Sequence, residues 1–411
     1  MTTLSVIVFA LVYLGMALGR VPGLAVDRTG VALLGLIVLL ASGDLRLDEV
    51  GRAIDMPTIA LLFALMIVSA QFESSGFYGW VAHRVTRAAQ SPNLVLAVLV
   101  AVPGLLSAVL TNDVVAVALA PLVCAGLLSN GLDARPYLVA LAGAANAGSA
   151  ATLIGNPQNI LIGQAGGLEF WPYVLFALPP SVLSLAAVYF AVVLTWRNSF
   201  ISETPTEARP LVNSPPLRRF QLIKALAAVA ALIALFLSPL PRDLSALAVA
   251  GALLLSKRMS SRALIGGVDW HLLLLFLCLF GVTAAFAKTG VAQDGLQWVA
   301  SEGLLPNRLG VMAPLTLAAS NTIGNVPAVI LVLKLIPGLS DGALTGLALL
   351  STFAGNLLLT GSLCNIIVAE RAQAAGVKLG FMDFARSGIP MTLVSMTVTF
   401  LWLWFSGLIP L

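Results

Sequence analysis

The chain has 411 residues, of which 59% are hydrophobic and only 10% are charged. Soluble domains carry about 25% charged residues, so this composition excludes a soluble protein. The 22 basic and 18 acidic residues leave a net charge of +4, which gives no reason to expect a nucleic-acid partner. Three cysteines and two histidines are too few and too scattered for a disulfide scaffold or a metal site. The sequence therefore predicts a multi-pass protein of the inner (plasma) membrane, surrounded by the lipid bilayer.

Stretches without any charged residue follow one another along the whole chain. A spanning helix needs about 20 mostly apolar residues, and most of these stretches reach that length. The first of them lacks a basic leader and a small-residue cleavage site, so we predict a retained helix rather than a signal peptide. In chain order they cover residues 2–19, 29–43, 56–72, 88–112, 114–132, 136–168, 170–196, 225–241, 244–256, 270–287, 309–333, 342–369 and 387–411.

One polar stretch, residues 197–224, interrupts this pattern with Pro, Ser, Thr and charged residues. Such a composition is typical of a solvent-exposed linker. It divides the chain into a first transmembrane repeat (1–196) and a second one (225–411). Residues 76–90 and 288–303 are amphipathic, and we expect them to form helices that lie at the membrane surface.

The two halves are internal duplicates. The stretch from Asp55, DMPTIALLFALMIVSAQFESSGFYGWVA, matches the stretch from Asp269, DWHLLLLFLCLFGVTAAFAKTGVAQDGLQWVA. Two further pairs of blocks match in the same order, and they align Asp113 with Asn325 and Gly155 with Gly361. Three ordered matches at similar spacing indicate a repeat architecture.

The apolar run 93–128 carries the polar triplet 111–113 near its middle. Its two arms are short for two complete spans, so we predict a re-entrant hairpin whose tip reaches mid-membrane. Non-helical backbone is tolerated at that depth only where protein or water covers it. Without the hairpin each half has about five spanning helices, an odd number, which inverts the second half. The predicted fold is an all-α membrane protein of two inverted repeats, each with a re-entrant hairpin and a broken helix.

The basic residues agree with this topology. With the amino terminus outside, sixteen of them fall on the inner side, including those of the cytoplasmic linker. Cytoplasmic loops carry such an excess of Lys and Arg in membrane proteins. The outer side keeps only Arg46, Arg52, Arg242, Lys288, Arg308 and Lys334. Asp27, Asp55 and Asp269 precede apolar runs and are expected to begin helices.

Four polar interruptions fall inside apolar runs, two in each half, at matching positions of the duplication. Gly and Pro end the helical ladder, because Gly frees the backbone and Pro lacks the amide hydrogen. Half-helix ends exposed in this way present amide hydrogens to anions and carbonyl oxygens to cations. A single Gly or Asn would be explained by packing alone, but four matched breaks predict a transport site. Its candidate solute- and ion-binding residues are Thr111, Asn112, Asp113, Gly155, Asn156, Pro157, Asn159, Ser320, Asn321, Thr322, Asn325, Gly361, Ser362 and Asn365.

Asp113 is the candidate coupling residue. It is the only charge between Arg87 and Asp133. A carboxylate at that depth is costly, so it is expected to face a cavity and to have a functional partner. Burial favours its protonated form, which suits proton coupling or the binding of a cation such as sodium. The alternative is a structural carboxylic acid hydrogen-bonded to a neighbouring helix break.

The segments LTNDVVAVALAPLV, NAGSAATLIGNPQNILIG and SNTIGNVPAVILVL resemble the ion transporter superfamily. That group includes arsenite permeases, sodium/proton antiporters of the NhaD type and citrate or dicarboxylate carriers. The resemblance covers nearly the whole chain and implies an inverted-repeat carrier that forms a homodimer and moves like an elevator. Its site residues would map onto Asn112, Asp113, Asn156, Asn159, Asn321, Thr322, Asn325 and Asn365. The dicarboxylate branch has Ser-Asn-Thr in both halves, whereas residues 111–113 of this chain resemble the arsenite and cation branches.

No Arg or Lys falls at any of the four breaks. A polyvalent anion would lack a fixed countercharge there, whereas a neutral metalloid acid would not need one. The working hypothesis is therefore efflux of arsenite or antimonite coupled to protons or sodium, with ion-coupled uptake of citrate or a dicarboxylate, or sodium/proton exchange, as alternatives. No cofactor is expected, and no nucleophile or nucleotide-binding motif favours an enzyme; a channel would not need paired inverted repeats. A separate ATPase subunit could bind the cytoplasmic face.

Overall fold

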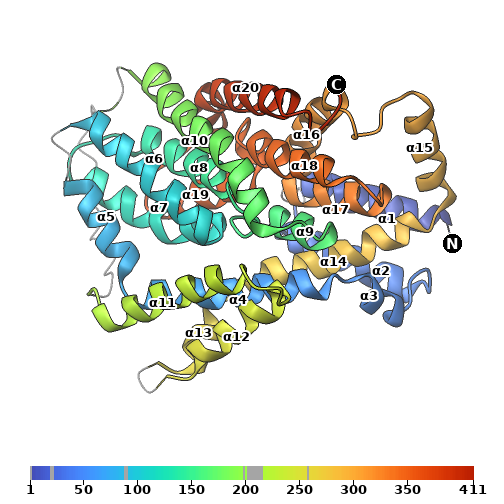
Figure 1. The fold of residues 1–411 in the computed structure, drawn as a ribbon, viewed down its shortest axis with the longest axis horizontal. Helices are drawn as coiled ribbons and strands as arrows, with labels where there is room; N and C mark the ends of the chain where they lie inside the picture. The colour runs from blue at the N-terminus through green and yellow to red at the C-terminus, as the bar shows by residue number, and fades with distance from the viewer. Residues whose placement is uncertain (1, 19–22, 88–90, 198–199, 201–215, 257–258) are drawn as a thin grey trace.

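A computed structural model describes residues 2–18, 23–87, 91–197, 200, 216–256 and 259–411. This part of the chain folds into twenty α-helices and one short 3₁₀ helix (Figure 1). Most of the predicted linker, residues 198–199 and 201–215, lies outside the described residues, as do Arg20, Arg209, Lys257 and Arg258. The fold is that of an all-helical, multi-span membrane protein.

The first half contains ten helices in chain order. They are α1 (Thr2–Leu18), α2 (Arg28–Ala41), α3 (Leu47–Ala53), α4 (Met56–Ser74), α5 (Phe77–Arg87), α6 (Pro92–Val109), α7 (Asn112–Leu128), α8 (Ala134–Ser149), α9 (Pro157–Ala165) and α10 (Phe170–Thr195).

The second half repeats this order element by element. Its members are α11 (Arg219–Leu235), α12 (Arg242–Leu254), α13 (Ser261–Gly266), α14 (Trp270–Ala287), α15 (Gly290–Ser301), α16 (Leu309–Ile323), α17 (Asn325–Leu335), α18 (Asp341–Ala354), η1 (Leu359–Gly361), α19 (Leu363–Ala374) and α20 (Phe381–Phe405). Five helices, α4, α6, α10, α14 and α20, are long and apolar enough to span a membrane by length and composition.

The helices form two layers, which Figure 1 shows one above the other. In the lower layer α4 packs against α11 and α12, while its counterpart α14 packs against α1 and α2. In the upper layer α8 packs against α6, α7 and α10, and α18 packs against α16 and α20. Each half therefore contributes to both layers, and equivalent helices make equivalent contacts.

Three predicted helix starts are confirmed by capping contacts. The carboxylates of Asp27, Asp55 and Asp269 accept hydrogen bonds from the backbone N–H groups three residues on, at 2.8–3.1 Å. Such a bond satisfies one of the amide groups that a helix leaves unpaired at its first turn.

The predicted linker ends earlier than its polar composition indicated. Helix α11 begins at Arg219, so residues 219–224 belong to the helix and not to the linker. The polar side chains of residues 219–224 favour a loop by composition alone, but apolar residues alternate with them and follow them, and these continue the helical pattern. Lys224 lies in α11, and its ammonium donates to the Leu253 carbonyl oxygen of α12 at 2.8 Å. The long side chain therefore places its charge at the end of the neighbouring helix.

The structure breaks the four apolar runs where the sequence predicts interruptions. Helices α6 and α7 are separated at residues 110–111, and α16 and α17 at Gly324, whose φ is +93°. Helices α8 and α9 are separated by residues 150–156, and α18 and α19 by residues 355–362, which include η1. Helix α6, with 18 residues, is longer than expected for a hairpin arm; the re-entrant path of α6 and α7 stays a prediction.

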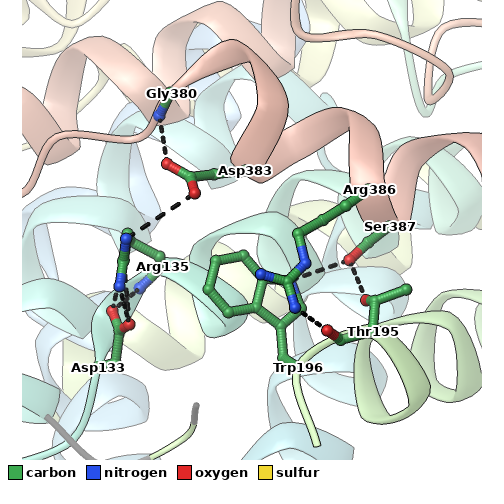
Figure 2. Close-up of polar contacts among 8 residues, drawn as sticks. All are labelled: Asp133, Arg135, Thr195, Trp196, Gly380, Asp383, Arg386 and Ser387. Atoms are coloured by element: carbon green, nitrogen blue, oxygen red, sulfur yellow. Dashed lines mark hydrogen bonds and ion pairs between the residues drawn. The ribbon is translucent and has the colours of Figure 1, made fainter. Parts of the chain in front are cut away.

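A cluster of aromatic and charged side chains joins the start of α8, the end of α10 and the start of α20 (Figure 2). The Trp196 ring is buried, and its Nε1 donates to the Ser387 hydroxyl at 3.0 Å. The Arg386 guanidinium lies 4.1 Å from the centre of that ring, and the Arg135 guanidinium lies 5.5 Å from it. Cation–π contacts of this kind are strongest where water is excluded.

Arg135 also holds two acidic residues, one from each half. It lies 2.6 Å from the Asp133 carboxylate and 3.8 Å from that of Asp383. The hydrogen bond to Asp133 raises the pKa of the Arg135 guanidinium. The cluster therefore connects the two halves at one end of the upper layer.

We expect Trp196→Ala to lower the free energy of unfolding by about 3–5 kcal/mol, because it empties a large buried site and leaves the Ser387 hydroxyl without its donor. Thermal unfolding of the purified protein in detergent measures this change. The control is Trp404→Ala, whose side chain is 43% exposed; that change is expected to stay within about 0.5 kcal/mol. Equal melting temperatures for both variants would contradict the proposed role of the cluster.

Candidate functional site

Asn146, in α8, lies at the centre of a buried amide network. Its Nδ2 donates to the Asn356 and Asn365 Oδ1 atoms at 2.8 and 2.9 Å. Its Oδ1 accepts from the Asn112 Nδ2 at 2.8 Å and from the Ser362 hydroxyl at 3.1 Å. A carboxamide has two donor hydrogens and two acceptor lone pairs, so this one side chain uses its complete hydrogen-bonding capacity.

The partners of Asn146 come from two of the four helix breaks, one in each half of the chain. Asn112 begins α7, and its backbone N–H also donates to the Gly155 carbonyl oxygen at 2.9 Å. The Asn365 Nδ2 donates to the Gly355 and Leu358 carbonyl oxygens, at 2.7 and 3.1 Å. The network therefore satisfies backbone groups that uncoiled segments expose, as burial at membrane depth requires.

Thr352, in α18, has the equivalent role toward the first half. Its hydroxyl accepts from the Asn156 Nδ2 at 3.3 Å and the Gln158 Nε2 at 3.1 Å, and it lies 3.3 Å from the Asn159 Oδ1. The Asn159 Nδ2 in turn donates to the Tyr173 hydroxyl at 3.1 Å. Each half thus sends one polar side chain into the broken helix of the other half.

The glycines of the two breaks are required by close packing. A Cβ at Gly155 would overlap the backbone of Ser149 and lie 2.8 Å from the Ser107 carbonyl oxygen. A Cβ at Gly361 would overlap the Asn321 Oδ1 and lie 2.8 Å from the Gly355 carbonyl oxygen. These two glycines occupy matching positions of the repeat, so the same backbone approach occurs in both halves.

Asn321, near the end of α16, contacts the same region. Its Nδ2 donates to the Ala354 carbonyl oxygen at 2.8 Å, and its Oδ1 accepts from the Leu358 backbone N–H at 3.2 Å. Because Asn365 also donates to the Leu358 carbonyl oxygen, α16 and the amide network are linked through residues 355–362. The Ser320 hydroxyl lies 3.4 Å from the Ser351 carbonyl oxygen of α18.

A cavity of about 520 Å³ is lined by residues of both layers and includes the break between α6 and α7 in its wall. Asp113 and Thr111 line it from α7, Pro157 lines it from α9, and Asp269 and His271 line it from the lower layer. The Thr111 hydroxyl is buried without a hydrogen-bond partner. Asp113 faces this cavity as expected, and its carboxylate makes no hydrogen bond to any described residue.

A second cavity of about 680 Å³ shares Asp269, His271 and Glu370 with the first. Because the two cavities have these wall residues in common, we call them together the passage, and we call the second cavity its mouth. The charged residues of the passage are Asp27, Arg28, Glu73, Asp113, Asp269, Glu370, Arg371 and Lys378. Arg28 and Lys378 lie at the mouth and Arg371 lines the first cavity, whereas the amide network contains no basic side chain.

The predicted site residues fall into three groups. Thr111, Asp113 and Pro157 line the passage. Thr322 is exposed, and its hydroxyl donates to carbonyl oxygens of its own helix, so no described contact joins it to the network. Asn325 is buried, and its side chain accepts only from the next backbone N–H. The rest form or flank the buried amide network: Asn112, Gly155, Asn156, Asn159, Ser320, Asn321, Gly361, Ser362 and Asn365.

The structure corrects the predicted repeat partner of Asp113. Asn112 and Asn325 are the first residues of α7 and α17, and each side chain accepts a hydrogen bond from the following backbone N–H at 3.0 Å. Asp113 is therefore equivalent to Val326 and not to Asn325. The sequence match was one residue out of register, because the helix start and not side-chain similarity fixes the equivalence.

Asn146, Thr352 and Asn356 were missed as site residues. Asn146 is the only amide side chain within the apolar sequence of α8, and that isolation was an available signal. Thr352 and Asn356 resemble ordinary packing residues in the sequence. In the described part of the chain no group of three or more His, Cys, Asp or Glu side chains could hold a metal ion.

Comparison with known proteins identifies the class. Residues 13–345 match the family described as citrate transporter. An uncharacterized transporter of Mycobacterium tuberculosis is 30% identical over 433 residues, which cover 98% of both chains. The silicon efflux transporter LSI3 of Oryza sativa subsp. japonica is 27% identical, over 91% of this chain and 92% of its own length. The putative transporter arsB of Dictyostelium discoideum is 23% identical, over 90% and 86%.

Among solved structures, the YdaH transporter of Alcanivorax borkumensis is similar, with a TM-score of 0.48, 14% identity and coverage of 99% and 98% of the two chains. The family match over residues 13–345 shows that the protein is a multi-pass membrane transporter and not an enzyme. The chain belongs to the citrate transporter family, whose members, in the ion transporter superfamily, are secondary transporters.

We expect Asn146→Ala to reduce transport by more than about tenfold, because it leaves several buried polar groups unpaired at once. The rate at which the transported solute enters vesicles, normalised to the amount of folded protein, measures this loss. Asn130→Ala is the matched control, since Asn130 caps the end of α7 through a single bond to the Gly126 carbonyl oxygen. Transport equal to that of the Asn130 variant would show that the network is not part of the site.

Proposed function

We propose that the protein is an inverted-repeat carrier that exports a small neutral metalloid acid, such as arsenous acid, in exchange for protons bound at Asp113. The observation that carries this proposal is the arrangement of the passage. The unpaired Thr111 hydroxyl and the Asp113 carboxylate line the passage at the break between α6 and α7, and the buried network behind them contains only amides, hydroxyls and backbone groups.

Polar contacts between loops support the inverted arrangement. On one side of the molecule the contacts pair Ser5 with Asp44, Glu49 with Lys288, Arg242 with Gly163, and Leu309 with Pro410. On the other side they pair Arg218 with Ser75, Thr29 with His271, and Arg135 with Asp383. Each pair joins segments that the predicted topology assigns to one side of the membrane.

The same contacts are consistent with starts of the two halves on different sides, since Ser5 lies in the first turn of α1 and Arg218 precedes α11. The positions of the equivalent helices α5 and α15 at opposite ends of the long axis (Figure 1) support this arrangement. Arg28, Arg371 and Lys378 line the passage, and all three belong to the predicted cytoplasmic side. The passage therefore corresponds to a state that is open to the cytoplasm.

The uncharged lining at the break between α6 and α7 favours a neutral, hydroxylated solute. The Thr111 hydroxyl has no partner in the protein and can both donate and accept, so it can replace part of the hydration shell of a polyhydroxy acid. A di- or trianion would instead require a buried countercharge, and none of the described residues at the breaks supplies one. Two relatives are named as a silicon efflux transporter and as arsB; silicic acid and arsenous acid are both neutral hydroxylated acids.

Asp113 suits proton coupling because it is isolated and yet reachable. It is only 6% exposed, and a charged carboxylate so placed is unfavourable unless a cation or proton binds. Asp269 and Glu370 lie along the passage toward its mouth, and they offer acceptors for a proton that moves between the cytoplasm and Asp113. In the proposed cycle Asp113 is protonated on the outside, and it releases the proton inside before the solute binds.

Uptake of citrate or a dicarboxylate is the second candidate. The family description favours it. So do the basic side chains of Arg28 and Lys378, which would attract an anion to the mouth of the passage, and that of Arg371, which lines the same cavity as Asp113. In that case bound sodium ions would have to supply the countercharge at the amide network.

We expect Asp113→Asn to reduce proton-driven accumulation of arsenite in everted vesicles by more than about tenfold, because an amide does not bind and release a proton in this pH range. Asp113→Glu should keep part of the activity. Asp294→Asn is the control, since Asp294 is exposed on α15.

Arsenite accumulation that survives Asp113→Asn at the original rate would contradict the coupling role. Transport of labelled citrate or succinate by the unmodified protein, with none of arsenite, would instead replace the first candidate with the second.

A further inference from the structure

Two arginines occupy equivalent positions at opposite ends of the interface between the layers. Arg28 is the first residue of α2 and Arg242 is the first residue of α12. They are 214 positions apart, as are the helix-capping residues Asp55 and Asp269. The repeat therefore relates one arginine directly to the other.

The segments that face these arginines are equivalent as well. Gly163 and Gln164 lie near the end of α9, and Ala369 and Glu370 lie in α19. Each pair of counterparts is 206 positions apart, the same separation as Gly155 and Gly361. Each arginine belongs to the lower layer, and each facing segment belongs to the upper layer.

The two ends nevertheless differ in their contacts. At the end assigned to the outside, Arg242 donates from Nη2 to the Gly163 carbonyl oxygen at 2.9 Å. A cation at the carbonyl end of a helix is favourable, so this bond fastens α12 to α9. At the other end, Arg28, Ala369 and Glu370 line the cavity of about 680 Å³, and the Arg28 Nε is buried without a hydrogen-bond partner.

We infer that Arg28 and Arg242 are positioning residues that fasten the two layers alternately, one at each end of the passage. In the state described here Arg242 holds the outer end closed, while Arg28 makes no hydrogen bond to the Ala369 carbonyl oxygen and interacts with Glu370 only electrostatically across the cavity. In the opposite state Arg28 donates to the Ala369 carbonyl oxygen, next to the Glu370 carboxylate, and Arg242 leaves Gly163. The inference rests on the inverted-repeat carrier proposed above, and it does not depend on which solute is carried.

Exchange of contacts between equivalent residues is what two oppositely oriented repeats require, because each repeat must adopt the conformation that the other has left. A charge-assisted bond lost at one end is then replaced by an equivalent one at the other end. The two states thereby remain close in free energy, which a reversible carrier needs.

The test measures the accessibility of single cysteines to a membrane-impermeant thiol reagent in sealed vesicles of both orientations. Gln164→Cys reports on the outer end and Ile367→Cys, which lines both cavities, on the inner end. The three native cysteines are buried, so the parent protein gives the background labelling.

We expect Arg242→Ala to increase outside labelling of the Gln164→Cys reporter about tenfold and to decrease inside labelling of the Ile367→Cys reporter, since one charge-assisted bond is lost from the inward-open state. Arg28→Ala should shift the labelling of both reporters in the opposite direction. It should also slow transport, because it traps the protein in the inward-open state. Arg28→Lys and Arg242→Lys should restore near-parental labelling, because lysine can still donate to the carbonyl oxygen. Arg52→Ala, on the exposed helix α3, is the control.

Labelling at both reporters that is unchanged by Arg242→Ala, or shifted in the same direction by the two alanine variants, would overturn the inference. Should Arg242→Ala fail to fold, Arg242→Gln keeps a shorter neutral donor and is expected to shift labelling in the same direction by a smaller factor. If the unmodified protein does not transport arsenite but Arg242→Ala and Arg28→Ala shift the labelling as expected, the proposed solute is refuted and the roles of the two arginines stand.

Discussion

The structure depends on one constraint: backbone groups that leave a helix at membrane depth must be satisfied by the protein itself. In this chain, polar side chains of each half bind the uncoiled segment of the other half. Asn146 of the first half binds Asn356, Ser362 and Asn365 of the second, and Thr352 of the second half receives hydrogen bonds from Asn156 and Gln158 of the first. Neither broken helix is complete without the other half, so the duplication is a requirement of the fold as well as a feature of the sequence.

That arrangement separates two tasks. The buried network fixes the relative position of α7, α8, α18 and α19. At the break between α6 and α7 it leaves the Thr111 hydroxyl and the Asp113 carboxylate in the wall of the passage, to which α19 adds Glu370 and Arg371. The lower layer supplies the opposite wall, with Asp269, His271 and Arg28. A rigid site carried by one layer, next to a wall of the other layer, is suited to a carrier whose layers shift against each other.

Much of this could be predicted from local chemistry. Gly155 and Gly361 break helices because of their backbone, and Asp27, Asp55 and Asp269 begin helices because of their short acceptor side chains; such signals act within a few residues. Asn146 and Thr352 were not predictable in this way, because their partners lie about 200 residues away along the chain. The one-residue error at Asp113 and the misplaced end of the linker have a different cause. The equivalence of the repeats follows the helix starts at Asn112 and Asn325 and not side-chain similarity, and the polar residues 219–224 already belong to the helical pattern of α11.

The relative orientation of the two halves is the central claim, and the sidedness of α5 and α15 tests it most directly. Single cysteines introduced as Arg84→Cys in α5 and Asp294→Cys in α15 are to be labelled with an impermeant reagent, first in intact cells and then after lysis. Our account predicts labelling of the α15 position in intact cells and of the α5 position only after lysis. Labelling of both positions under the same condition would place these helices on one side of the membrane and would contradict the inverted arrangement.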